Sequence, residues 1–213
     1  MSLYEILKAK LGQWKGNNYP SDFPAIAEIL EFNFESETRN LRFLRKAQLE
    51  ALETYWYLRL VEGTPHIFDL YRRTYADPVE LFSALGISLS QNDLIKKMSR
   101  GGLDSVFEGI KEDDEFVRNY RLEGLRETLS LRYPSYILAL AMGAGKTILI
   151  GAIIATEFAM ALEYPDDSRF VKNALVFAPG KTILGALKEL SDIPFEKILP
   201  PRFYKEFIST VKF

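Results

Sequence analysis

The sequence predicts an α/β fold, in which a helical N-terminal region precedes a partial parallel sheet flanked by helices. Three observations lead to this prediction. Residues 1–130 contain short amphipathic segments separated by Gly, Pro, Asn and Asp, as short helices do. From residue 135 onward, a short apolar run leads through a glycine-rich turn into a long apolar helix. Residues 174–191 repeat this order, and strands that alternate with helices form parallel sheets.

The expected helices show apolar residues at helical spacing, and the expected strands are short apolar runs bounded by turn residues. The helices are expected at residues 38–60, 78–85, 91–98, 112–129, 147–162 and about 183–191, and the strands at 136–142, 174–178 and, as a third candidate, 203–213. In the first helix, Gln48 lies on the apolar stripe, four residues from both Leu44 and Leu52. A buried amide at this position needs hydrogen-bond partners.

The composition is that of an ordinary globular protein. The 213 residues are 47% hydrophobic and 26% charged, which is enough to bury one sizeable core or two small ones. The chain has no cysteine and a single histidine, His66, which excludes a disulfide framework and a Cys/His zinc cluster. The lack of cysteine fits a cytoplasmic protein. The net charge of −2 gives no general attraction to a polyanion, so any contact with nucleic acid needs a local basic surface.

No targeting or membrane segment is expected. The N-terminus carries charged residues where a secretory signal would be apolar. Residues 136–162 are apolar over a length that could span a bilayer, but two glycines, a lysine and Glu157 interrupt them. We interpret this region as a buried strand followed by a buried helix.

A phosphate-binding loop is predicted after the first apolar run. The triplet Gly145-Lys146-Thr147 opens an apolar helix, and Gly143 lies two places before it. Glycines let the backbone turn its N–H groups towards a phosphate, and a helix N-terminus adds partial positive charge. Lys146 is expected to reach the β- and γ-phosphates of ATP, and Thr147 to bind the Mg²⁺ that bridges them; Ala144 contributes only its backbone. The alternative is a glycine turn with an exposed lysine.

A second Gly-Lys-Thr triplet, at Gly180, Lys181 and Thr182, is not predicted to bind the nucleotide. Pro179 precedes it and has no N–H group to donate, and no second glycine lies nearby.

Two stretches resemble motifs of the superfamily-two helicases and translocases, which include the DEAD/DEAH-box proteins. The sequence AMGAGKT, at residues 141–147, resembles their motif I, the Walker A P-loop, although Met142 stands where that motif commonly has Thr. The sequence FLRKAQLEAL, at residues 43–52, resembles their LRxxQxxA stretch. This second resemblance implies that Gln48 recognises adenine. An internal backbone partner for Gln48 is the alternative.

A third stretch, ALVFAPGKTIL at residues 174–184, resembles motif Ia of the same superfamily. This resemblance implies a contact with the sugar-phosphate backbone of a nucleic-acid strand. The contacting residues would be Pro179, Gly180, Lys181 and Thr182. The alternative is a capped helix start with a solvated lysine.

The restriction (Res) subunits of type III restriction systems are the members that the chain resembles most. The resemblance implies a helical region at 1–130, with a Q-motif-like helix at 38–60, and a partial RecA-like P-loop ATP-binding domain at 131–213. The long separation between Gln48 and Lys146 implies an inserted helical subdomain at about 62–129. The implied activity is that of a helicase-like, DNA-binding ATP hydrolase.

Two parts of such a motor are missing from the sequence. No carboxylate pair of the Walker B kind follows a strand, so no catalytic residue is assigned, and no second RecA-like domain follows. The chain is therefore expected to be the N-terminal ATP-binding portion of a DNA-directed ATPase that does not hydrolyse ATP alone. Its expected partners are DNA and a missing C-terminal half or a modification subunit. A non-catalytic nucleotide-binding or interaction module, and an unrelated P-loop enzyme such as a small kinase, are the alternatives.

A basic cluster precedes Gln48. Its members are Arg39, Arg42, Arg45 and Lys46. These side chains have the charge to contact phosphate, but nearby glutamates favour a solvated helix face.

Overall fold

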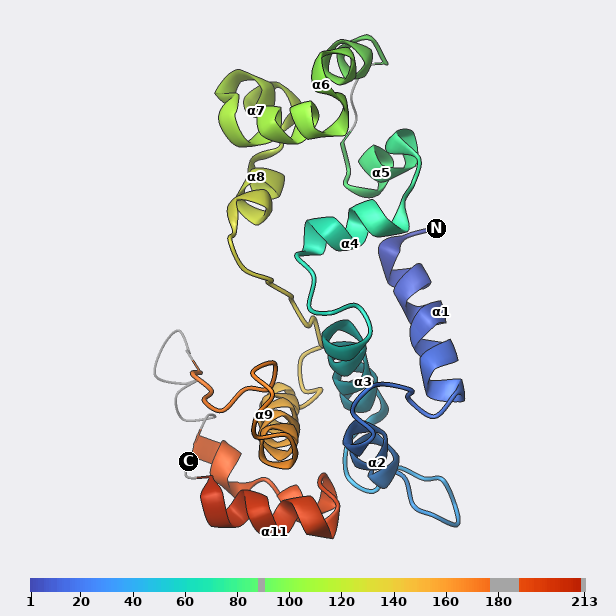
Figure 1. Ribbon diagram of the computed structural model, residues 1–213, viewed down its shortest axis with the longest axis vertical. Coiled ribbons are helices and arrows are strands. Elements are labelled where there is room, and N and C mark those ends of the chain that lie inside the picture. The colour runs from blue at the N-terminus through green and yellow to red at the C-terminus, as the bar shows by residue number, and fades with distance from the viewer. Residues whose placement is uncertain (88–90, 177–187, 212–213) are drawn as a thin grey trace. The chain divides into compact units, whose positions relative to one another are not determined.

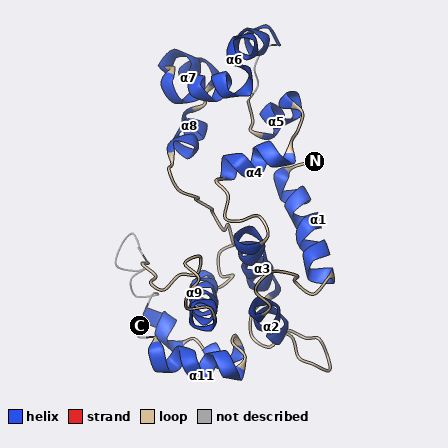
Figure 2. Ribbon diagram, in the orientation of Figure 1, coloured by secondary structure: helices blue, strands red, loops and turns tan. Residues whose placement is uncertain are grey.

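The computed structural model describes residues 1–87, 91–176 and 188–211, and the regular secondary structure within these ranges is helical (Figures 1 and 2). The chain divides into two compact units. The first combines Met1–Lys10 with Glu62–Ile137, and the second combines Leu11–Val61 with Leu138–Phe213.

The predicted parallel sheet is not found among these residues, and the predicted α/β fold class is wrong: the described chain is all-α. Residues 136–142 and 174–176 have no regular structure, and the β-bridge between Phe34 and Leu41 is isolated. A short apolar run becomes a strand only when a neighbouring segment pairs with its backbone, and no described segment pairs with 136–142 or 174–176. Residues 177 and 178 of the second predicted strand lie outside the described ranges. The prediction of a RecA-like core, and of the P-loop, Walker A, helicase-like fold built on it, is therefore also wrong for the described chain.

The candidate third strand is also wrong. Residues 203–210 belong to helix α11, Pro201–Thr210, where Phe203 and Phe207 lie one turn apart and are both buried, and residues 212 and 213 lie outside the described ranges. This i, i+4 spacing gives the segment one apolar helix face, and most residues on the other faces are exposed.

Helix α9, Lys146–Glu163, lies at the centre of the second unit and confirms the predicted apolar helix. It packs against α2 (Ala25–Phe32), α3 (Lys46–Leu60), α11 and the short 3₁₀ helix η1 (Glu189–Asp192). Much of its buried surface is alanine, which lets the neighbouring helices approach closely. A second 3₁₀ helix, η2 (Phe195–Lys197), connects η1 to α11.

Helix α3 begins at Lys46, and not at Thr38 as the sequence predicts. Arg39 has a left-handed φ of 57°, which no α-helix accommodates. Arg42 turns the same segment back onto α2, because its backbone N–H donates to the carbonyl of Asn33 and its guanidinium donates to that of Phe32. Residues 38–45 are therefore a loop.

In the first unit, helices α4 to α8 follow one another along the chain. Their bounds are Ile67–Thr74 for α4, Pro78–Ala84 for α5, Gln91–Glu112 for α6, Asp114–Tyr120 for α7 and Glu123–Ser130 for α8. The helix predicted at 78–85 is confirmed. The helix predicted at 112–129 is two helices, because Arg121 adopts a left-handed conformation between them. Helix α6 continues past the predicted end at residue 98, with a break at Gly101 and Gly102.

Side chains cap three of these helices. The Asp77 carboxylate accepts from the N–H groups of Val79 and Glu80, and the Asp113 carboxylate accepts from that of Phe116. His66 is the N-cap of α4, where its Nδ1 accepts from the N–H of Phe68. Such caps satisfy backbone donors that helices leave unpaired at their N-termini.

Across the described ranges, we find no helix with both the length and the apolar character needed to cross a membrane.

Gly151 is the position within α9 where packing against the neighbouring segment requires a glycine. A Cβ at this residue would lie 2.4 Å from Cδ1 of Ile193, in the segment that follows η1. We expect Gly151→Leu to lower the free energy of unfolding by roughly 1–3 kcal/mol, because the added side chain displaces this buried segment. Urea unfolding monitored by circular dichroism measures the change.

Gly12→Leu is the matched control, because Gly12 is an exposed helical glycine in the same unit with no atom near its Cβ position. This variant should gain up to about 1 kcal/mol from helix propensity. A loss of stability of equal size in both variants would contradict the packing assigned to Gly151.

Candidate functional site

Residues 141–145 form a turn that leads directly into α9, and Lys146 and Thr147 are the first two residues of that helix. The N–H of Ala144 donates to the carbonyl of Ala141 over 3.2 Å. Gly143 has a φ of 75° and Gly145 has a φ of 78°, and Gly145 is the N-cap of α9. Both conformations lie in the left-handed region, which favours glycine over every other residue. The two glycines named by the sequence therefore do shape this loop.

The start of α9 presents backbone donors without a protein acceptor. Leu149 is the first residue of the helix whose N–H finds a carbonyl, that of Gly145 at 3.2 Å. For the N–H groups of Lys146, Thr147 and Ile148, no described residue supplies an acceptor. These donors carry the partial positive charge of the helix N-terminus, which attracts anions.

Gln48 joins helix α3 to this loop. Its side chain is only 1% exposed, and its Nε2 donates to the carbonyl of Gly145 over 2.9 Å. Its Oε1 accepts from the backbone N–H of Arg45 over 2.7 Å. The structure thus supplies internal partners for this amide, as the alternative reading of the sequence expected. Recognition of adenine by Gln48 stays a prediction.

The contact with Gln48 gives Gly145 a second reason to be glycine. A Cβ at residue 145 would lie 2.4 Å from Nε2 of Gln48, which is closer than real contacts allow. At Gly143 no atom lies within 4 Å of the same position. The backbone of residue 145 therefore approaches α3 as closely as it does only because it has no side chain.

Two cationic side chains converge on the loop. Nη1 of Arg45 donates to the carbonyl of Gly143 over 2.9 Å, and Nζ of Lys146 donates to that of Ala141 over 3.2 Å. Both side chains are exposed, and neither forms an ion pair with a carboxylate in the described part of the chain. The loop therefore combines two positive charges with the positive end of α9.

Arg45 is a residue that sequence reasoning assigned to a solvated helix face. Other members of the basic cluster have their own partners: Arg39 pairs with Glu31 at 2.6 Å, and Lys46 with Glu50 at 4.0 Å. Arg45 differs because it is the N-cap of α3, three residues before Gln48. Its position three residues before Gln48 could have identified it as a neighbour of the loop. The prediction that the helix begins at Thr38 placed Arg45 inside the helix instead.

Thr147 lies half-buried in the first turn of α9, and its hydroxyl has no hydrogen-bond partner among the described residues. This position suits the predicted contact with Mg²⁺ carried by a nucleotide, since a hydroxyl oxygen is a ligand that Mg²⁺ accepts. Within the same residues, no group of three or more His, Asp or Glu side chains is arranged to hold a metal ion.

The residues predicted to contact nucleic acid lie outside the described ranges. They are Pro179, Gly180, Lys181 and Thr182. Their assignment stays a prediction.

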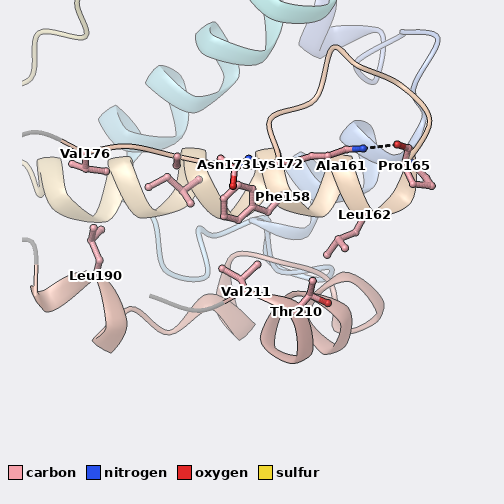
Figure 3. Close-up of a pocket in the computed structure, with 12 residues that line it drawn as sticks. Phe158, Ala161, Leu162, Pro165, Lys172, Asn173, Val176, Leu190, Thr210 and Val211 are labelled. Atoms are coloured by element: carbon pink, nitrogen blue, oxygen red, sulfur yellow. Dashed lines mark hydrogen bonds between the residues drawn. The ribbon is translucent and has the colours of Figure 1, made fainter.

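A cavity of about 730 Å³ lies on another face of α9 (Figure 3). Phe158 and Leu162 of α9 line it together with Val176 and Val211. Lys172 is the charged residue among its described lining, and its Nζ donates to the carbonyl of Pro165 over 2.7 Å. The largely apolar lining suits hydrophobic contact and not phosphate binding, so the loop is the better candidate site.

Comparison with protein-family models, curated proteins and solved structures found no match for this chain. The resemblance to the superfamily-two motors therefore rests on the short motifs themselves.

Replacing the two loop glycines by alanine separates backbone strain from the contact with Gln48. Gly143→Ala should lower the free energy of unfolding by about 1 kcal/mol, because alanine must adopt the left-handed conformation. Gly145→Ala should lower it by at least about 1 kcal/mol more, because its Cβ also meets the buried Gln48 amide. Chemical denaturation of the two variants measures both changes.

The additional loss in Gly145→Ala should shrink when Gln48→Ala is combined with it, since the two changes act on one contact. Equal losses in the two glycine variants, or full additivity in the double variant, would contradict the close approach of Gln48.

Proposed function

We propose that the loop at residues 141–147 binds the phosphate groups of ATP together with Mg²⁺, and that this chain is the ATP-binding portion of a DNA-directed ATPase. The observation that carries the proposal is the convergence of Arg45 and Lys146, two exposed cations without a carboxylate partner in the described chain, on a glycine loop at a helix N-terminus. Such a combination of positive groups attracts an anion.

A phosphate would give these groups better acceptors than they have now. Arg45 and Lys146 both donate to neutral carbonyl oxygens of the loop. A phosphate oxygen carries a negative charge, so a hydrogen bond to it from a cationic donor gains a Coulombic attraction that a neutral carbonyl oxygen does not offer. The N–H groups at the start of α9 would add further donors without any rearrangement of the helix.

Phosphate recognition is better supported than base recognition. Gln48 is buried, and both ends of its amide already have internal partners. It would have to leave Gly145 or Arg45 before it could pair with adenine in both directions. Arg45 and Lys146 are exposed and need only exchange one acceptor for another.

The wider proposal keeps the expected partners and location. DNA would be contacted by the segment at residues 179–182, and a C-terminal half or a modification subunit would complete the ATPase. The absence of cysteine favours a cytoplasmic location. No residue is proposed to activate water, so the proposal for this chain is ATP binding.

Calorimetric titration with ATP and Mg²⁺ tests the phosphate site. We expect Lys146→Ala and Arg45→Ala each to weaken binding by about tenfold or more, because each removes a charged hydrogen bond worth roughly 1.5–3 kcal/mol. Inorganic tripolyphosphate should compete with ATP, since the site recognises the phosphates.

Lys172→Ala is the matched control for this titration. Lys172 is also an exposed lysine of the second unit that donates to a carbonyl, that of Pro165, but it lies on the cavity in Figure 3 and not on the loop. Its variant should bind ATP with an unchanged dissociation constant. If the folded wild-type chain binds neither ATP nor tripolyphosphate, the proposal fails and an interaction module without nucleotide becomes the better reading.

A further inference from the structure

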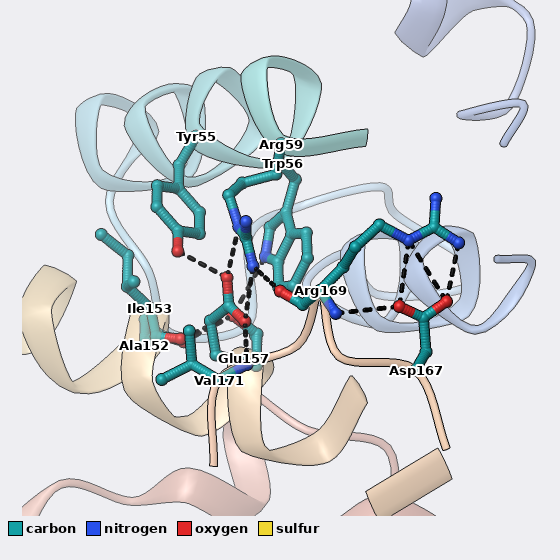
Figure 4. A network of polar contacts seen from close by, with 10 residues as sticks. Tyr55, Trp56, Arg59, Ala152, Ile153, Glu157, Asp167, Arg169 and Val171 are labelled. Carbon is teal, nitrogen blue, oxygen red and sulfur yellow. Dashed lines mark hydrogen bonds and ion pairs between the residues drawn. The ribbon is translucent and has the colours of Figure 1, made fainter. Parts of the chain in front are cut away.

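A buried polar network connects α3 to α9 away from the loop (Figure 4). Its centre is Glu157 of α9, which is 2% exposed. Oε1 of Glu157 accepts from the hydroxyl of Tyr55 at 2.5 Å and from Nε of Arg59 at 2.7 Å. Oε2 accepts from Nη2 of Arg59 at 3.2 Å and from the N–H of Val171 at 3.0 Å. Two side chains of α3 and one backbone N–H from the segment after α9 therefore donate to a single carboxylate.

Two further hydrogen bonds extend this network. Nη2 of Arg59 also donates to the carbonyl of Arg169 at 2.5 Å. The indole Nε1 of Trp56, which is fully buried, donates to the hydroxyl of Thr156 at 3.0 Å, and that hydroxyl donates to the carbonyl of Ala152. Each polar group of the network has a partner, so the interface specifies one arrangement of the two helices.

Tyr55 and Arg59 both stay in their protonated forms beside the Glu157 carboxylate. Burial raises the pKa of Tyr55 well above its ordinary value, and the nearby Glu157 carboxylate raises it further. The hydroxyl of Tyr55 therefore stays protonated and keeps donating to Glu157. Burial lowers the pKa of Arg59, but the hydrogen bond and the negative charge of Glu157 outweigh it and raise that pKa overall.

The polar contacts between α3 and α9 advance along both helices in the same direction. Near the start of each helix, Gln48 contacts Gly145; about two to three turns later, Trp56 contacts Thr156 and Arg59 contacts Glu157. The two helices therefore run in the same sense, and a slide of one along the other would break all of these contacts together.

The hydrogen bonds of the network are directional, and they resist a slide of α3 along α9. A displaced Glu157 would lose partners that no water replaces, because its carboxylate is buried.

We propose that Glu157 is a positioning residue for the loop at residues 141–147. By fixing α3 on α9, it holds Gln48 against Gly145 and Arg45 against Gly143. Its consequence for ATP affinity rests on the proposed function, whereas its effect on the loop does not require ATP. The network thereby preorganises a phosphate site that none of its own members touches.

Glu53 provides a matched control. It is also a buried glutamate of the second unit, 1% exposed, and it also accepts from a tyrosine hydroxyl and a cation: Tyr19 at 2.7 Å and Lys15 at 2.6 Å. Its partners precede α2 in the chain and do not belong to α9. Glu53→Gln therefore disturbs a comparable buried cluster without touching the contact between α3 and α9.

The test is amide hydrogen exchange in the full chain without nucleotide, with each variant held the same interval below its own Tm. Glu157→Gln should speed exchange of the hydrogen-bonded N–H groups of Ala144 and Leu149 by at least tenfold, because the loop loses its hold on α3. Glu53→Gln should leave the exchange of these two N–H groups within twofold of wild type. Equal exchange in the two variants, or unchanged exchange in Glu157→Gln, would overturn the proposal.

ATP titration of the same proteins separates this proposal from the proposed function. Glu157→Gln should weaken ATP binding at least fivefold, Glu53→Gln should not, and Glu157→Gln should add little in an Arg45→Ala background. If the wild-type chain does not bind ATP, the proposed function fails while hydrogen exchange still decides the positioning role. If ATP binds equally well to both glutamate variants and exchange is unchanged, only the positioning role fails.

Discussion

The side-by-side packing of α3 on α9 is the interaction on which the second unit depends. It joins segments about one hundred residues apart, and it includes hydrogen bonds from α3 to Gly145, Thr156 and Glu157. Because no sheet is found in the described chain to organise the loop before α9, helix α3 does so. The conformation of the loop is thus a tertiary property, although its glycines are local.

The parts of the fold that follow from local physics were predictable from the sequence. Helix α9 follows from its long apolar run, and α5 from Asp77 and the proline after it, which favour a helix start. The sheet was not predictable, because an apolar run of five to seven residues becomes a strand only through a partner elsewhere in the chain. At the C-terminus, the spacing of Phe203 and Phe207 outweighed the apolar character that suggested a strand.

In the candidate site too, the features set by local sequence were predictable and the long-range contacts were not. Gly143 and Gly145 were identifiable because a positive φ is a local property of one residue, which glycine adopts at little cost. Burial of Gln48 followed from its helical stripe, but its partner, the carbonyl of Gly145, is a long-range contact that no local pattern encodes. Arg45 was misplaced for two reasons: the left-handed Arg39 moved the helix start, and the contact with Gly143 spans 98 residues.

The geometry separates the groups that hold the loop from those that would bind a ligand. Gln48 is buried, and its bond to Gly145 has no competitor in solvent, so an arriving anion leaves it in place. Arg45 and Lys146 are exposed and bonded to neutral carbonyls, so an anion can draw both away. Binding at this loop therefore needs a change in two flexible side chains and none in the backbone. A site of this kind depends on the rigidity of the α3 and α9 pair behind it, which is where the buried charge of Glu157 lies.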